Sequence, residues 1–103
     1  MKRLPLASGV VDELGTAALI RQALEYAPKD GLTVEGMRTR IRVLDALEDA
    51  EMAQAAVLLL EDADAAILQS CAAAARWREF HRGIVAFGDA VAGMETVSAN
   101  GGS

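Results

Sequence analysis

The sequence predicts a mainly α-helical fold, with about four helices packed in a small bundle. Apolar side chains recur at helical spacing, most regularly between residues 34 and 47. Alanine, which has the highest helix propensity, occurs 21 times. Thr16, Thr33 and Asp62 stand directly before such stretches, where N-cap residues are expected. A short β-hairpin or β-ribbon from residues 2–13 and 56–60 is the one β element that the pattern allows.

The chain has 103 residues, which is enough for one domain. We expect residues 1–95 to form this helical domain, and residues 96–103, which end in Asn-Gly-Gly-Ser, to form a disordered tail. Hydrophobic residues make up 52% of the chain but aromatic residues only 4%. Because alanine buries little apolar area, the predicted core is thin, and self-association would add buried surface.

The N-terminal segment is predicted to be extended. Pro5 is unsuited to a helix interior, and Ser8-Gly9 favours a turn between residues 3–6 and Val10-Val11. Such a hairpin would be marginal alone, so residues 56–60 are its expected third partner.

The first helix is expected at residues 17–26, with Thr16 as its N-cap. Leu19, Ala23 and Tyr26 follow at helical spacing and form its apolar face. Pro28 ends the helix, and residues 29–31 form the following turn.

The second helix has the most regular pattern in the chain. Thr33 is its expected cap, and its apolar stripe consists of Val34, Met37, Ile41, Leu44 and Leu47. This stripe either faces the core, which we favour, or forms a seam between subunits. Arg38 and Arg42 share another face, and Asp45 is close enough in sequence to pair with Arg42. Gly36 suggests a close approach near the start of the helix.

The second half of the chain contains two further helices. Residues 57–60 are four bulky apolar residues that suit a strand or a helix equally. Asp62 is the expected N-cap of a helix at residues 65–75, with Asp64 in its first turn. A break around residues 77–82 precedes the last helix. Gly83, Gly88 and Gly93 recur every five residues, which does not keep them on one face, so they predict no close-packing motif.

The charge pattern favours protein partners. The net charge of −5 argues against a generic nucleic-acid binder. Residues 43–75 contain seven acidic and no basic residues, with arginines on either side. This acidic block is either a solvated face or a surface that attracts the arginines of a partner. We see no signal peptide and no membrane-spanning run, and expect a location in the cytoplasm or a virion.

No residues predict catalysis or metal binding. Cys71 and His81 are the only residues of their kinds, and ten residues along one continuous helix would separate them by roughly 15 Å. The acidic triplet Glu61, Asp62 and Asp64 lacks the glycine and the distal Glu of an EF-hand loop, and a helix start explains it. We therefore predict a protein that is not an enzyme and that has no metal and no cofactor.

One cluster has the composition of a recognition surface. It contains Arg76, Trp77, Arg78, Phe80 and Arg82, and Trp and Arg dominate the energetics of protein interfaces. Arginine and Trp77 would also suit a nucleic-acid backbone and its bases, but the acidic net charge makes a protein the favoured partner. The competing interpretation is that Trp77 and Phe80 belong to the core.

Three stretches carry a resemblance to a known group of proteins: residues 31–47 (GLTVEGMRTRIRVLDAL), residues 60–64 (LEDAD), and Trp77 with residues 84–87 (IVAF). Over about residues 31–91, the chain resembles small proteins encoded in tailed-phage and prophage morphogenesis clusters. The resemblance implies a tail-assembly or head-tail completion role, without catalysis. The implied partners are the chain itself and other phage structural or assembly proteins, and the contact surfaces are Arg38 and Arg42 together with residues 76–82.

From the resemblance and the cluster, we expect a phage assembly or structural protein that acts through protein contacts and self-association. The alternative is a small regulator that binds a transcription factor or nucleic acid through residues 76–82.

Overall fold

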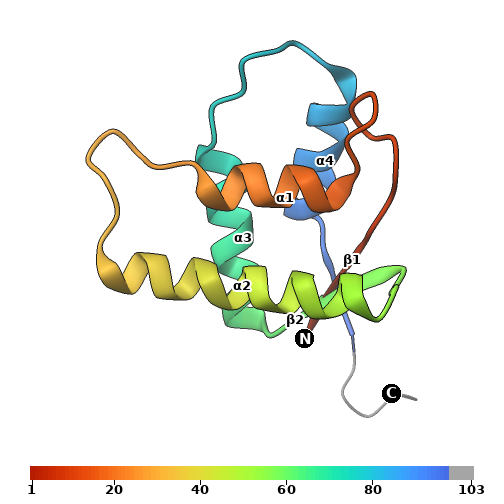
Figure 1. Cartoon of the computed structure of the whole chain (residues 1–103), viewed down its shortest axis with the longest axis horizontal. Coiled ribbons are helices and arrows are strands. Elements are labelled where there is room, and N and C mark those ends of the chain that lie inside the picture. Colours follow the sequence, from red (N-terminus) through yellow and green to blue (C-terminus); the bar gives the residue numbers. More distant parts are fainter. Residues whose placement is uncertain (98–103) are drawn as a thin grey trace.

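The computed structural model describes residues 1–97, which form four helices and a three-stranded antiparallel sheet (Figure 1). This confirms the predicted fold class. The elements in chain order are β1 (Lys2–Pro5), α1 (Thr16–Glu25), α2 (Val34–Met52), β2 (Val57–Leu60), α3 (Asp62–Ala74), α4 (Arg82–Ala92) and β3 (Glu95–Thr96). Residues 98–103 of the expected tail lie outside the described residues.

Helix α3 is the central element, because it packs against α1, α2, α4 and β2. In Figure 1, α1 and α2 run side by side and α3 crosses behind both. Its inner face consists of Ala65, Leu68 and Cys71, all of which are buried. The small alanine side chains of α3 let its neighbours approach closely.

The sheet has the order β2-β1-β3 and lies at the edge of the bundle. In β1 and β2, Leu4 faces Leu58, and both are buried together with Leu60. Leu59 alternates to the outer face and is 49% exposed. Residues 57–60 are therefore a strand, and the predicted ribbon between residues 56–60 and the N-terminus is correct.

Two details of the predicted β structure were wrong. Val10-Val11 does not pair with β1, because Val11 forms an isolated bridge with Leu14 in a tight turn in which Asp12 has a φ of 54°. Thr96, which was expected in the tail, pairs with Lys2 as part of β3, and the Val97 N–H donates to the Met1 carbonyl at 2.7 Å. The N-terminal strand is therefore the middle strand of the sheet.

Two of the predicted helix caps were displaced by one residue. Gly15 is the N-cap of α1, and the Thr16 hydroxyl instead accepts a hydrogen bond from the Ala7 N–H at 3.1 Å. Glu61 is the N-cap of α3, so Asp62 is its first helical residue. Thr16 is buried under the N-terminal segment, and its hydroxyl bonds the backbone there.

The cap of α2 was predicted correctly, but its inner face was predicted correctly only at Leu44 and Leu47. The Thr33 hydroxyl accepts a hydrogen bond from the Gly36 N–H at 2.9 Å. Val43 and Leu47 are the fully buried residues of α2, whereas Val34, Met37 and Ile41 are 65%, 47% and 51% exposed. Half-buried Ala46 and Ala50 contribute to the inner face, because their small size lets the rest of the fold pack closely.

The core is built mainly from leucine, alanine and valine. Phe87 is the one aromatic residue among the buried side chains of residues 1–97. Trp77 meets it edge to face, with ring centroids 6.0 Å apart and an interplanar angle of 76°. Among residues 1–97, no helix is both long and apolar enough to cross a membrane.

Candidate protein-binding surface

The predicted cluster lies in the loop between α3 and α4, and the structure divides it into two parts. Trp77 is half-buried and packs against the core through Phe87. Phe80 is 102% exposed, so its whole ring lies in solvent. The core interpretation therefore holds in part for Trp77 and is wrong for Phe80. Trp77 anchors the loop, and Phe80 is displayed on it.

Three arginines surround Phe80 in sequence and are exposed, namely Arg76, Arg78 and Arg82. Within residues 1–97, none of them forms an ion pair with a carboxylate. The loop therefore carries cationic groups that the rest of the described fold does not neutralise.

Two adjoining cavities open beside the loop. The larger, of about 500 Å³, lies between α1, the turn at residues 11–14 and the loop, and its apolar and aromatic lining is Val11, Leu14, Leu19, Tyr26, Trp77 and Ile84. The smaller, of about 370 Å³, is lined by Trp77, Phe80, Ile84 and Val85 together with Arg76 and Arg82. Trp77 and Ile84 belong to both linings. The two cavities thus form one largely apolar groove, whose lining also carries three arginines and the carboxylates of Glu25 and Glu79.

The end of the loop is fixed to the N-terminal segment. The His81 Nδ1 accepts a hydrogen bond from the Gly83 N–H at 2.9 Å and so caps α4. The His81 Nε2 is 3.7 Å from the Asp12 carboxylate. A Cβ on Gly83 would lie only 1.9 Å from the Val10 carbonyl oxygen, so α4 begins in direct contact with that segment.

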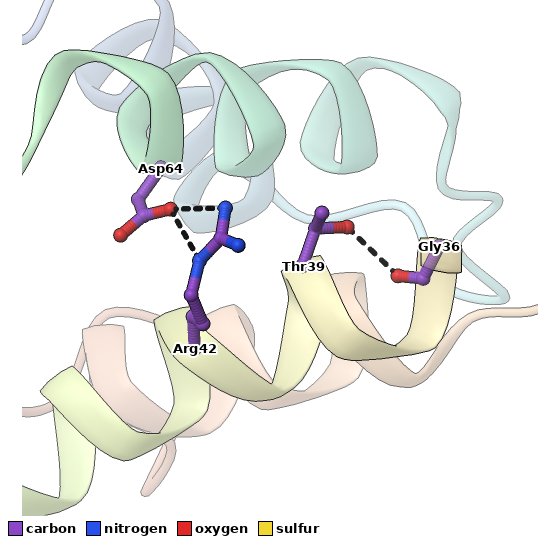
Figure 2. Close-up of polar contacts among 4 residues, drawn as sticks. All are labelled: Gly36, Thr39, Arg42 and Asp64. Carbon is purple, nitrogen blue, oxygen red and sulfur yellow. Dashed lines mark hydrogen bonds and ion pairs between the residues drawn. The ribbon is translucent and has the colours of Figure 1, made fainter. Parts of the chain in front are cut away.

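The other two predicted site residues, Arg38 and Arg42, are on α2, which Figure 1 shows well apart from the α3–α4 loop. Figure 2 shows that Arg42 contacts Asp64 of α3, with Nε and Nη2 at 3.2 and 3.0 Å from Oδ1. Arg42 therefore pairs with Asp64 rather than with the predicted Asp45. Within the described part of the chain, Arg38 has only Glu35 within reach, at 3.6 Å, and both side chains are more than 70% exposed.

Sequence reasoning missed the role of Arg40. Its Nη1 donates to the backbone carbonyls of Leu24 at 2.7 Å and Tyr26 at 2.8 Å, at the C-terminal end of α1. These carbonyls have no partner within their own helix, and a cation is favourable at that end of the helix dipole. No local pattern distinguishes this arginine from its neighbours, because its partners lie 14 and 16 residues away.

The close approach predicted at Gly36 occurs at Gly83 instead. A Cβ on Gly36 would meet only its own cap, the Thr33 hydroxyl, at 3.2 Å. Its carbonyl accepts a hydrogen bond from the Thr39 hydroxyl at 2.9 Å (Figure 2). The start of α2 is therefore held by contacts within the helix.

The three residues of the acidic triplet, Glu61, Asp62 and Asp64, make different contacts at the start of α3. Glu61 is the N-cap, and Asp64 pairs with Arg42. Asp62 lies 2.9 Å from the Met1 amino group, and this hydrogen bond lowers the pKa of the Asp62 carboxyl. Among residues 1–97, no three His, Cys, Asp or Glu side chains are placed to hold a metal ion together.

Cys71 and His81 both have contacts that belong to the fold. Cys71 is buried in the core, and this burial raises the pKa of its thiol. His81 forms the cap of α4, as described above.

Comparison of the chain with protein-family models, with curated proteins and with solved structures gave no match.

Proposed function

We propose that the chain is a non-enzymatic protein-binding module whose contact surface is the α3–α4 loop and the groove beside it. The observation that carries the proposal is Phe80, an aromatic ring wholly exposed on the loop. Trp77 anchors this loop to the core, and the loop ends at His81, the N-cap of α4. An exposed aromatic ring beside an apolar groove is typical of an interaction surface.

The charges at the loop support a partner with acidic and apolar side chains. Arg76, Arg78 and Arg82 would pair with carboxylates, and an apolar side chain would fill the groove that Trp77 and Ile84 line. An arginine without a partner in the free protein gives up little when it binds, since no internal ion pair has to break.

The resemblance over residues 31–91 favours one biological setting for this module. We propose that it is a phage or prophage assembly or structural component, present in the cytoplasm or in the virion. Its partners would then be other assembly proteins, and the genes on either side of its own would encode them.

The test is binding of the purified neighbouring gene products to the chain, measured by calorimetry. We expect Phe80→Ala to weaken binding at least 30-fold, as for an interface hot spot. Leu59→Ala is the matched control, because Leu59 is 49% exposed on the outer face of the sheet, and it should change the affinity less than about twofold. Equal affinity of the Phe80→Ala variant and the native chain would overturn the proposal.

The same arginines favour a second candidate, a regulator that binds nucleic acid. Its signature is affinity for a DNA or RNA oligonucleotide that falls steeply with salt and is lost in an Arg76→Ala, Arg78→Ala double variant. That outcome, together with no binding to the neighbouring proteins, would replace the assembly proposal with this one.

A further inference from the structure

Helix α2 carries an apolar stripe that no other described element covers. Val34, Met37 and Ile41 follow at spacings of three and four residues and are 65%, 47% and 51% exposed. Half-buried Leu44 continues the stripe by one more turn. In Figure 1, α2 forms the outside of the molecule, with α1 beside it and α3 behind. Contiguous exposed apolar residues of this kind mark interaction surfaces.

Three exposed charged residues lie on the same face of α2 as the stripe. Arg38 lies in the N-terminal half, and Asp45 and Glu48 lie in the C-terminal half, all three exposed. Within residues 1–97, Asp45 and Glu48 form no ion pair, and the contact of Arg38 with Glu35 is a solvated pair at 3.6 Å. Arg38 is therefore the exposed cation beside the stripe, and Asp45 and Glu48 are exposed carboxylates two to three turns further along the helix.

We propose that the occupant of this stripe is α2 of a second copy of the chain, packed antiparallel across a two-fold axis beside Ile41. With a rise of about 1.5 Å per residue, this register places Ile41 against Ile41 of the second copy and Met37 within about 1.5 Å, along the axis, of its Leu44. Arg38 then lies about 1.5 Å along the axis from Asp45 of the second copy and about 6 Å from its Glu48.

The antiparallel arrangement follows from the charges. In a parallel pair, each Arg38 would face Arg38 of the other copy, and each Glu48 would face Glu48, so like charges would meet. Reversing one helix instead brings Arg38 of each copy near Asp45 and Glu48 of the other. The surface is thus complementary to itself under a two-fold rotation, which is the requirement for an isologous dimer.

This inference goes beyond the proposed function, because α2 and the α3–α4 loop are separate surfaces (Figure 1). A dimer through α2 leaves both loops open to a partner. One helix from each copy makes a contact at the small end of stable interfaces, below about 1,200 Å², so we expect a dissociation constant of about 1 to 100 μM.

The first test is the mass in solution over a range of concentrations from about 1 μM to 1 mM, by sedimentation equilibrium. The native chain should rise from 10.8 kDa toward twice that mass. Ile41→Lys should remain at the mass of one chain throughout, because two lysines would meet at the axis. Leu59→Lys is the matched control at an exposed leucine of the sheet, and it should dimerise as the native chain does.

The second test measures the orientation by cysteine cross-linking in a Cys71→Ala background. Ile41→Cys should form a disulfide between copies, because the two residues meet at the axis. Met52→Cys, at a residue that is 85% exposed, should not, since an antiparallel register separates the two copies of residue 52 by about 33 Å. Cross-linking of both variants would indicate a parallel pair and overturn the proposal, as would a native chain that stays monomeric.

The third test reverses the charges. Arg38→Glu should weaken the dimer at least tenfold, and adding Asp45→Arg and Glu48→Arg to it should restore the native affinity. No recovery would contradict the proposed register. Ile41→Lys should still bind a partner through Phe80, and Phe80→Ala should still dimerise, so the failure of either proposal is distinguishable from the failure of the other.

Discussion

Gly83 shows how much one residue contributes to the placement of the candidate site. Its Cα faces the Val10 carbonyl so closely that an added Cβ would lie 1.9 Å from the oxygen and 2.8 Å from the carbon. The sequence indicated Gly36 as the close approach and no role for Gly83, because spacing along one helix says nothing about which glycine meets a distant segment. The contact with Val10 joins residues more than 70 positions apart.

We predict that Gly83→Ala destabilises the fold by about 3 kcal/mol, since the backbone of either α4 or the N-terminal segment must move. Gly88→Ala is the control within the same helix. A Cβ there meets no atom within 4 Å, so alanine should stabilise the fold by about 1 kcal/mol through its helix propensity.

Urea denaturation of the two variants, followed by circular dichroism, measures both effects. Similar free energies of unfolding for the Gly83→Ala variant and the native chain would show that α4 does not begin against Val10.

The loop at residues 75–81 shows what composition predicts about a site. The proximity of arginine and aromatic residues in sequence was enough to identify the cluster as a candidate surface. It did not determine which ring packs inward, because Trp77 is held by Phe87 from the following helix. The partition of Trp77 and Phe80 is a property of tertiary packing, and no local pattern predicts it.

At the scale of elements, α2 shows what hydrophobic periodicity predicts and what it does not predict. The spacing of Val34, Met37 and Ile41 correctly indicated a helix with one apolar face. It did not indicate what covers that face. The residues of α2 that are fully buried are Val43, which was not in the predicted stripe, and Leu47, which was its last member. Alanines next to these two residues allow the close packing, whereas hydrophobic periodicity gives most weight to large side chains.

The strands show a related limit of local patterns. Residues 57–60 contain four apolar residues in a row, so their alternation between inner and outer faces is invisible in the sequence. Strand β3 has two residues, Glu95 and Thr96, which is too short for any period. Strands β2 and β3 are both defined by their pairing with β1, whose residues are distant in the sequence. A local pattern alone therefore does not define them.

Helix α2 also carries three arginines, and we predict that Arg40 contributes more to stability than Arg38 does. It is the residue that joins α2 to the carbonyls at the end of α1. Arg40→Ala should destabilise the fold by about 2 kcal/mol, as expected for a hydrogen bond from a charged donor to carbonyls that would otherwise lose their partner.

Arg38→Ala should change the free energy of unfolding by less than about 0.5 kcal/mol, because its side chain is 72% exposed. Thermal denaturation at a concentration that keeps the chain monomeric separates the two variants. A larger loss for Arg38→Ala than for Arg40→Ala would contradict the contacts that the structure assigns.

At the scale of the whole molecule, composition predicted the class and the size of the fold better than the arrangement of its parts. The number of helices followed from stretches of helical spacing, and the thin core followed from the excess of alanine over aromatic residues. The position of α3 at the centre depends on contacts that each neighbour makes separately. Helices α1 and α2 are also joined to each other by the Arg21–Glu51 ion pair. The hydrogen bond from Arg21 lowers the pKa of the Glu51 carboxyl.

Cys71 reports on the integrity of this core, because it lies on the buried face of α3. Burial raises the pKa of its thiol above the value of about 8.5 that an exposed cysteine has, since a thiolate in the core would lose its hydration. The folded chain therefore holds this proton more tightly than the unfolded chain does. The resulting stability is present in full below about pH 8.5 and is lost as the pH rises through the raised value.

We predict that above about pH 8.5 the native chain loses stability faster than a Cys71→Ala variant does, by up to about 1.4 kcal/mol for each pH unit. Subtracting the variant isolates the contribution of the thiol, because the two proteins differ only at residue 71. Urea denaturation of both proteins at pH 7, 8.5 and 10 gives the two slopes. The same slope in both proteins would mean that the thiol is as accessible to water in the folded state as in the unfolded state, and that α3 is not packed as the structure has it.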